Sequence, residues 1–235
     1  DIMGSEIIDS DRNFKFVKGP LFGNIILADE INRTPPKTQS ALLEAMQEKS
    51  VTVGGKTYRL DFPFFVLATQ NPIEQEGTYP LPEAQLDRFM FSIMIDYPNY
   101  DEELSIVKKT TNVNNVEIKN VINAEQILNY QKSLFNIPVP DSVYSYAVGL
   151  VRKTRPNTKN CPEEISKFID FGAGPRASQY LILGAKMNAI LSGKLTPDVE
   201  DVRSVSFDVL RHRVVKNYKA EAEGISVEEL IKNLF

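Results

Sequence analysis

Two short apolar runs without polar alternation stand out in the first hundred residues. Residues 24–28 read Asn-Ile-Ile-Leu-Ala and residues 64–68 read Phe-Phe-Val-Leu-Ala. Short runs that are apolar nearly throughout are typical of strands buried on both faces of a parallel sheet. The pattern therefore predicts two neighbouring strands of such a sheet.

A helix is expected between these two runs. Thr34 can cap its start, and the prolines at 35–36 suit a first turn, where a missing N–H leaves no hydrogen bond unmade. Small and apolar residues then recur at helical spacing as far as about Lys49. Because parallel strands need a crossover connection, a helix in this place fits the predicted sheet.

The remaining segments of the first hundred residues predict short elements. Residues 51–60 alternate β-forming side chains around Gly54-Gly55, which indicates a hairpin with a primed turn. Residues 1–20 indicate a loop or a hairpin. A short helix is expected near 83–87, and residues 89–95 are expected to form a further strand.

Beyond about residue 100 the strand patterns give way to helical spacing. The fold class expected is α/β, with a parallel central sheet in residues 1–98 and an all-α domain in residues 99–235. Helical spacing recurs in six segments, at 101–111, 124–135, 141–153, 176–192, 198–214 and 226–234.

Two adjacent carboxylates, Asp29 and Glu30, end the first apolar run. In open α/β sheets ligands bind outside the carboxyl ends of the strands, so acidic catalytic groups are expected there. One acid can hold hydrated Mg²⁺ while the next polarises a water for attack on a phosphate, as in a Walker B element. The alternative is that the pair only ends a strand and caps the following helix.

At two further places the sequence allows both a functional and a purely structural interpretation. The polar residues Thr69, Gln70 and Asn71 end the second apolar run. They either reach the same pocket as Asp29 or form a turn that Asn71 caps. Arg176 lies in the first turn of a predicted helix, where a cation opposes the helix dipole. It is either solvated or paired with an anionic ligand.

One apparent phosphate-binding loop is rejected. Gly55-Lys56-Thr57 resembles the end of G-x-x-x-x-G-K-[ST], but Ser50 stands where the first glycine is required. The segment also lies in a β-patterned run rather than before a helix.

Composition narrows the class of protein. The net charge of -4 argues against general nucleic-acid binding, and no apolar run is long enough to span a membrane. A single cysteine, Cys161, excludes an internal disulfide and fits a cytoplasmic location. His212 is expected to be a partly exposed helix residue, without a role in metal binding or acid–base catalysis.

The ordered set of motifs resembles the MoxR family of AAA+ ATPases over nearly the whole chain. The segments that carry the resemblance are ILADEINR at 26–33, PPKTQSALLEAM at 35–46, LATQNP at 67–72, EGTYPLPEAQLDRF at 76–89, GPRAS at 174–178 and LRHR at 210–213. Each motif alone is weak evidence for the family, whereas the whole set in this order is highly specific to it. The resemblance implies an AAA+ core followed by a helical lid.

The resemblance also implies the roles of five residues toward ATP and Mg²⁺. Asp29 matches the Walker B acid that orients Mg²⁺ through water, and Glu30 the base that activates the attacking water. Asn71 matches sensor 1. Arg88 matches the arginine finger that reaches the nucleotide of a neighbouring subunit, and Arg176 matches sensor 2 of the lid. Each would place charge or a donor where negative charge develops during phosphoryl transfer.

By the same resemblance, the protein is expected to form a hexameric ring and to remodel or mature protein clients with a von Willebrand factor A partner. Residues 2–20 resemble the helix-2 insert, and residues 51–60 the pre-sensor-1 hairpin. The phosphate-binding loop of the family would lie upstream of residue 1. We therefore expect this polypeptide alone to bind ATP poorly and to hydrolyse it negligibly.

Three other functions are considered. The chain could be a scaffold of the same fold that no longer hydrolyses ATP, although a scaffold has no physical need for all five site residues. It could be a subunit like the magnesium-chelatase ATPase, which shares the architecture. A DNA-acting AAA+ protein is disfavoured by the acidic balance.

Overall fold

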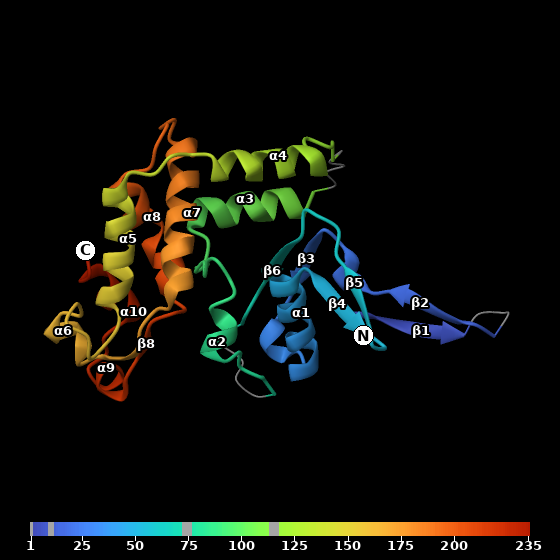
Figure 1. The fold of residues 1–235 in the computed structure, drawn as a ribbon, viewed down its shortest axis with the longest axis horizontal. Helices are drawn as coiled ribbons and strands as arrows, with labels where there is room; N and C mark the ends of the chain where they lie inside the picture. The colour runs from blue at the N-terminus through green and yellow to red at the C-terminus, as the bar shows by residue number, and fades with distance from the viewer. Residues whose placement is uncertain (1, 9–11, 72–76, 113–117) are drawn as a thin grey trace.

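The computed structural model describes residues 2–8, 12–71, 77–112 and 118–235. Its buried apolar residues form two clusters, one drawn from positions 21–81 and the other from positions 143–234. Figure 1 shows these clusters as two bodies, with a long hairpin extending away from the first and the C-terminus in the second.

The two apolar runs form the predicted parallel pair of strands. β3 (Ile25–Ala28) pairs with β6 (Phe65–Ala68) in a register that joins Ile25 to Phe65 and Ala28 to Ala68. The crossover between them contains α1 (Pro36–Glu48). This arrangement brings the residues that follow each strand to one edge of the sheet.

The start of α1 differs from the prediction. Pro35 is the residue that precedes the helix, and Thr34 does not cap it. The Thr34 hydroxyl instead donates a hydrogen bond of 2.7 Å to the Ile31 carbonyl, where it closes a 3₁₀ turn at Ile31–Arg33. A proline at the cap position fixes an extended backbone without any side-chain hydrogen bond.

The expectation that both faces of the sheet are buried is wrong for the described residues. One face, with Ile26 and Val66, packs against the first cluster. On the opposite face the large apolar side chains are exposed, because none of the described elements covers them. They are Ile25 (65% exposed), Leu27 (66%), Phe65 (55%) and Leu67 (49%).

Both hairpins form. β1 (Gly4–Ile8) pairs antiparallel with β2 (Phe14–Lys18), and β4 (Ser50–Val53) with β5 (Lys56–Arg59). The second turn has φ of 58° at Gly54 and 76° at Gly55, as a primed turn requires. The Lys56-Thr57 pair lies in a strand, which confirms that it is not part of a phosphate-binding loop.

The predicted strand at residues 89–95 is absent from the structure. Residues 91–99 have no regular secondary structure, and the Ser92 amide donates to the Asp208 carbonyl of a helix, at 2.8 Å. The side chains of Ile93, Met94 and Ile95 are largely exposed. Apolar content alone therefore misled the prediction, since none of the described strands pairs with this segment.

The predicted helices are all present. Besides α1, they are α2 (Glu83–Leu86), α3 (Tyr100–Thr110), α4 (Ala124–Phe135), α5 (Asp141–Lys153), α7 (Pro175–Leu191), α8 (Val199–Leu210) and α10 (Val227–Lys232). The prediction missed several short elements, namely the 3₁₀ helices η1 (Pro20–Phe22) and η2 (Ile31–Arg33), and α6 (Glu163–Ser166), β7 (Ile169–Phe171), β8 (Val215–Lys216) and α9 (Tyr218–Ala222). No helix in the described part of the chain is both long and apolar enough to cross a membrane.

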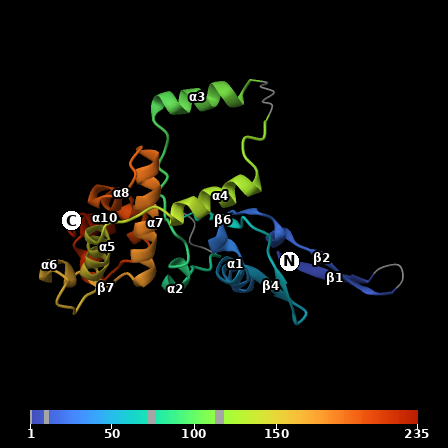
Figure 2. The same ribbon diagram turned by 45° about the horizontal axis from the view of Figure 1, so that its top comes forward.

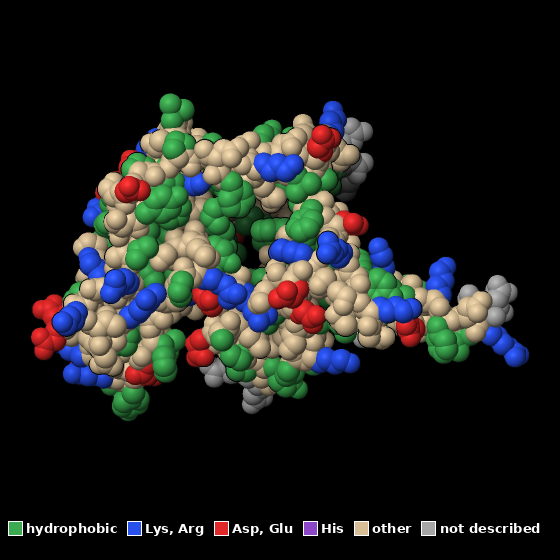
Figure 3. Space-filling view, viewed as in Figure 1, with side chains coloured by type: hydrophobic (Ala, Val, Ile, Leu, Met, Phe, Trp, Pro, Cys, Tyr) green, Lys and Arg blue, Asp and Glu red, His purple; other side chains and the backbone are tan. Residues whose placement is uncertain are grey.

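The helices differ in how they pack. α7 packs against both α5 and α8 and contributes four buried residues to the second cluster, namely Ala177, Leu181, Ile182 and Ala185. By contrast, α3 and α4 contain no buried residue. α3 and α4 run side by side in Figure 1, but Figure 2 separates them. Figure 3 shows hydrophobic side chains around the hollow in the middle of the face that these helices border.

Thr154 is fully buried beside the second cluster, and its hydroxyl forms two hydrogen bonds whose effect on stability can be tested. Its hydroxyl accepts a hydrogen bond from the Ala173 amide (2.9 Å) and donates to the Val151 carbonyl (2.7 Å). In Thr154→Val the buried amide loses its partner, so the free energy of unfolding should fall by about 1–3 kcal/mol. Thr158→Val removes a similar hydrogen bond, from an exposed hydroxyl to the Arg155 carbonyl, and is the matched control. Urea unfolding that gives equal values for the two variants would contradict the prediction.

Candidate nucleotide site

A hydrogen-bonded bridge joins the carboxyl ends of β3 and β6. The Thr69 hydroxyl donates to Asp29 Oδ1 at 2.5 Å and accepts from the Glu30 amide at 2.8 Å. The backbones are tied as well, because the Thr69 amide donates to Ala28 and the Ile31 amide donates to Thr69. The two predicted acids are therefore held at one edge of the sheet, as the sequence indicated.

Glu30 has a left-handed backbone conformation, with φ of 47° and ψ of 52°. Residues other than glycine rarely adopt this conformation, and such strain clusters at functional sites. The Glu30 carboxylate pairs with Arg33 at 3.3 Å, and both side chains are at least 40% exposed. Exposed ion pairs are worth at most about 1 kcal/mol, so this carboxylate can exchange its partner at little cost.

Asn71 lies beside the same edge. Its carbonyl accepts a hydrogen bond of 3.3 Å from the Asn32 side-chain amide. The Asn32 carbonyl accepts from the Tyr79 amide at 2.6 Å, and the buried Gln39 side chain donates to the carbonyls of Ile31 and Tyr79. These bonds fasten the loops around the strand ends to α1.

The other two predicted site residues, Arg88 and Arg176, lie where the first cluster meets the second. Arg88 follows α2, and its carbonyl accepts from the Tyr180 hydroxyl at 3.4 Å. Within the described ranges its guanidinium has no hydrogen bond or ion pair. Arg176, on the first turn of α7, pairs with Asp87 at 3.2 Å. Asp87 is therefore the anion that offsets the unfavourable position of Arg176 on its helix.

Arg213 is the most buried charged group at this junction, with a side chain that is 1% exposed. Its Nε donates to Asp87 Oδ1 at 2.7 Å. Its Nη2 donates to the carbonyls of Asp87 (2.9 Å) and Phe89 (2.6 Å), and its guanidinium lies 5.1 Å from the ring centre of Tyr180. Burial of this charge lowers its pKa, which the Asp87 carboxylate partly offsets.

His212 is not a helix residue as predicted, since it follows the end of α8. Its Nε2 lies 3.1 Å from the Phe89 carbonyl oxygen, and because a carbonyl can only accept, Nε2 carries the proton. Burial, followed by the positive charge of Arg213, lowers the pKa of His212 from 6.5 to about 4. The ring is therefore neutral near pH 7.

The structure thus gathers the predicted residues into two groups. Asp29, Glu30 and Asn71 lie at the strand ends, and Arg88 and Arg176 lie at the junction. Sequence reasoning placed Thr69 near the pocket but gave it no role. It missed Asp87 and Arg213, although both belong to the quoted motifs. Their hydrogen bonds to distant backbone atoms leave no pattern in the sequence.

Asp29 fits the chemistry of a magnesium ligand. No three acidic, histidine or cysteine residues of the described ranges gather into a metal cluster. Mg²⁺ commonly uses only one or two carboxylates and completes its shell with water and phosphate oxygens. The exposed Asp29 carboxylate, oriented by Thr69, suits such an ion when a nucleotide supplies the phosphate.

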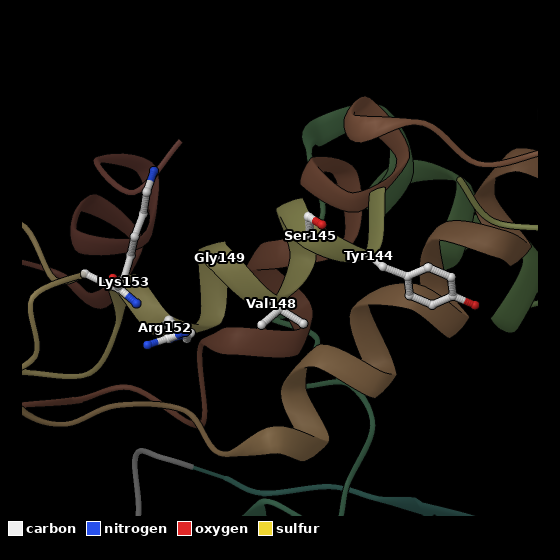
Figure 4. A pocket seen from close by; sticks show the side chains of 7 residues that line it. Tyr144, Ser145, Val148, Gly149, Arg152 and Lys153 are labelled. Carbon is white, nitrogen blue, oxygen red and sulfur yellow. The ribbon is translucent and has the colours of Figure 1, made fainter. Parts of the chain in front are cut away.

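A groove of about 600 Å³ lies elsewhere, along α5. Figure 4 shows Tyr144, Val148 and Arg152 along one side of this helix. None of the five predicted site residues lines the groove. We therefore place the candidate site at the strand ends and the junction, where charged groups are fixed by hydrogen bonds.

Comparison with known families agrees with this arrangement. Residues 1–91 match the model described as "ATPase family associated with various cellular activities (AAA)". Residues 163–234 match the AAA lid domain. The chain therefore has the fold of an AAA+ ATPase with a helical lid.

Two related proteins and one solved structure align with this chain over its whole length. YeaC of Bacillus subtilis is 41% identical over 236 residues, which span 71% of its length. Chaperone MoxR1 of Mycobacterium tuberculosis is 42% identical over 235 residues, or 62% of its length. A solved structure of a protein from Cytophaga hutchinsonii, which is assigned as an ATPase, superposes with a TM-score of 0.91 and is 43% identical in sequence. The match covers this whole chain and 72% of that protein. The chain belongs to the MoxR family of AAA+ ATPases.

The lowered pKa of His212 predicts a pH effect on stability. Between pH 6.5 and about 4 the unfolded chain takes up a proton at this residue that the folded chain refuses. Stability is therefore lost as the pH falls through this window, by roughly 3 kcal/mol. His212→Gln removes this contribution, so urea unfolding should show a smaller loss on acidification than in the parent. Parallel pH profiles for the two proteins would refute the assignment.

Proposed function

We propose that the complete protein hydrolyses ATP at the edge formed by the ends of β3 and β6. The observation that supports this most directly is the Thr69 hydroxyl, which bonds both the Asp29 carboxylate and the Glu30 amide. Two acids held side by side, one fixed and one exchangeable, suit a metal-assisted attack of water on a phosphate.

The proposed chemistry uses each acid differently. Asp29 would hold hydrated Mg²⁺, which would supply positive charge to neutralise the phosphates. Glu30 leaves Arg33 and accepts a proton from a water whose oxygen bonds to the γ-phosphorus. The bond from that phosphorus to the ADP oxygen breaks, and ADP leaves with the electron pair. Asn71 holds the water as sensor 1.

Two arginines from adjacent subunits are proposed to act on each γ-phosphate. Arg176 contacts it from the lid of its own subunit, as sensor 2. Arg88 reaches it from the neighbouring subunit, as an arginine finger, and its guanidinium has no competing partner among the described residues. An arginine finger stabilises the charge of the transition state and contributes about 10³–10⁵ in turnover in NTPases.

We propose that a phosphate-binding loop outside this chain completes the site, so that this polypeptide alone binds ATP poorly. The exposed apolar face of β3 and β6 supports this, since side chains such as Leu27 need a covering element in the complete protein. The trans role of Arg88 further calls for a closed ring, for which we propose six subunits.

The cellular role proposed is chaperone-like maturation of protein complexes in the cytoplasm, together with a von Willebrand factor A partner. The support is family membership and the name of one relative, Chaperone MoxR1. A scaffold without hydrolysis is the principal alternative, and the two experiments below separate it from an ATPase.

The first experiment replaces the proposed base. In the complete protein, Glu30→Gln should keep ATP binding but lower hydrolysis by about 10²–10⁴-fold, because the amide cannot accept the proton. Glu48→Gln, at the exposed end of α1, is the control and should hydrolyse ATP like the parent. Undiminished turnover in Glu30→Gln would rule out the base, and a parent without any turnover would favour the scaffold.

The second experiment tests the arginine finger. Arg88→Ala should assemble but lose about 10³-fold or more in hydrolysis. Mixing it with Glu30→Gln subunits should restore activity, because these lend an intact Arg88 to a neighbour whose Glu30 is intact. Assembled mixed rings that stay inactive would show that Arg88 does not act in trans.

A further inference from the structure

The lid holds the backbone on both sides of Arg88. Arg213 donates to the carbonyls of Asp87, at 2.9 Å, and of Phe89, at 2.6 Å. It also donates to the carbonyl of Met90, at 3.3 Å. Four consecutive carbonyls are thereby bound by lid side chains, because Tyr180 takes the carbonyl of Arg88 itself.

Asp87 connects this contact to the second arginine of the proposed site. Its Oδ1 accepts from Arg213 at 2.7 Å and its Oδ2 pairs with Arg176 at 3.2 Å. The two partners differ in burial, since the Arg213 side chain is 1% exposed and that of Arg176 is 38% exposed. The buried Asp87–Arg213 ion pair is therefore the stable one, whereas the more exposed Arg176 can leave Asp87 for another anion.

We propose that Asp87 and Arg213 are positioning residues that fix Arg88 to the lid, so that lid movement sets where this finger reaches the neighbouring subunit. The inference rests on the proposed trans role of Arg88. Arg88 adjoins Asp87 and carries no ion pair of its own among the described residues. Its placement therefore depends on the backbone that Arg213 and Tyr180 hold.

The same geometry makes Asp87 a resting partner for Arg176. When Arg176 turns to a γ-phosphate, Asp87 keeps its bond to Arg213, and the backbone around Arg88 stays in place. Loss of the Asp87 charge should therefore affect turnover and ATP binding differently. Turnover should fall because Arg88 is no longer held in place for the nucleotide of the neighbouring subunit. ATP binding should not weaken, because Arg176 has lost the carboxylate that competes with the γ-phosphate.

The test uses Asp87→Asn and Arg213→Lys in the complete protein. Asn keeps the shape of Asp and loses its charge, and Lys keeps the charge of Arg but cannot span several carbonyls. Each variant should assemble, keep or tighten ATP binding, and lose about 10- to 100-fold in turnover, since a misplacement of 1 Å has this effect. Glu200→Gln, which breaks an exposed lid ion pair to Arg203, is the control and should match the parent.

Mixed rings separate positioning from a structural role. Asp87→Asn subunits should regain activity with Glu30→Gln subunits, which supply a correctly held Arg88. They should regain no activity with Arg88→Ala subunits, because neither kind of subunit then provides a correctly placed finger. A residue that served only its own nucleotide would show the reverse pattern.

The outcomes also separate failure of the positioning role of Asp87 and Arg213 from failure of the proposed trans role of Arg88. Failure of Glu30→Gln to rescue Arg88→Ala would overturn the trans finger itself. Rescue of Arg88→Ala but not of Asp87→Asn would overturn only the positioning role. Parent-like turnover in Asp87→Asn and Arg213→Lys, or loss of assembly in both, would overturn it too, because the contact would then be dispensable or purely structural.

Discussion

The arrangement at the junction depends on the ion pair between Asp87 and Arg213. A guanidinium whose side chain is 1% exposed is stable only beside an opposite charge and with its remaining donors bonded. Asp87 supplies the charge, and the carbonyls of Asp87 and Phe89 take the donors. One buried charge thus fixes the segment after α2 against the lid and determines where Arg88 and Arg176 lie.

A second constraint comes from the parallel strands. Because β3 and β6 run in the same direction, the residues after both strands meet at one edge, and Thr69 can bond both Asp29 and Glu30. This edge gathers acids and amides, whereas the junction gathers arginines. Metal-assisted hydrolysis of a phosphate can use both kinds of group, which supports the proposal that the strand ends and the junction act in one reaction.

The sequence predicted the elements whose signal is local. The apolar runs, the Gly54-Gly55 turn and the helical spacing each depend on near neighbours. The strand at 89–95 and the double burial of the sheet were wrong because both depend on which elements pack alongside. Asp29 and Glu30 were found from their place after a strand. The bridging role of Thr69, and Asp87 and Arg213 altogether, were missed because their partners lie far away in the chain.

The central claim is that each γ-phosphate is acted on by the strand ends and Arg176 of one subunit together with Arg88 of the neighbouring subunit. The most direct measurement is a structure of the complete protein with Mg²⁺ and a non-hydrolysable ATP analogue. We expect the metal beside Asp29, Arg176 on the γ-phosphate of its own subunit, Arg88 on that of the neighbour, and Arg213 still on Asp87. A nucleotide bound elsewhere, with Arg176 still paired to Asp87, would contradict the account.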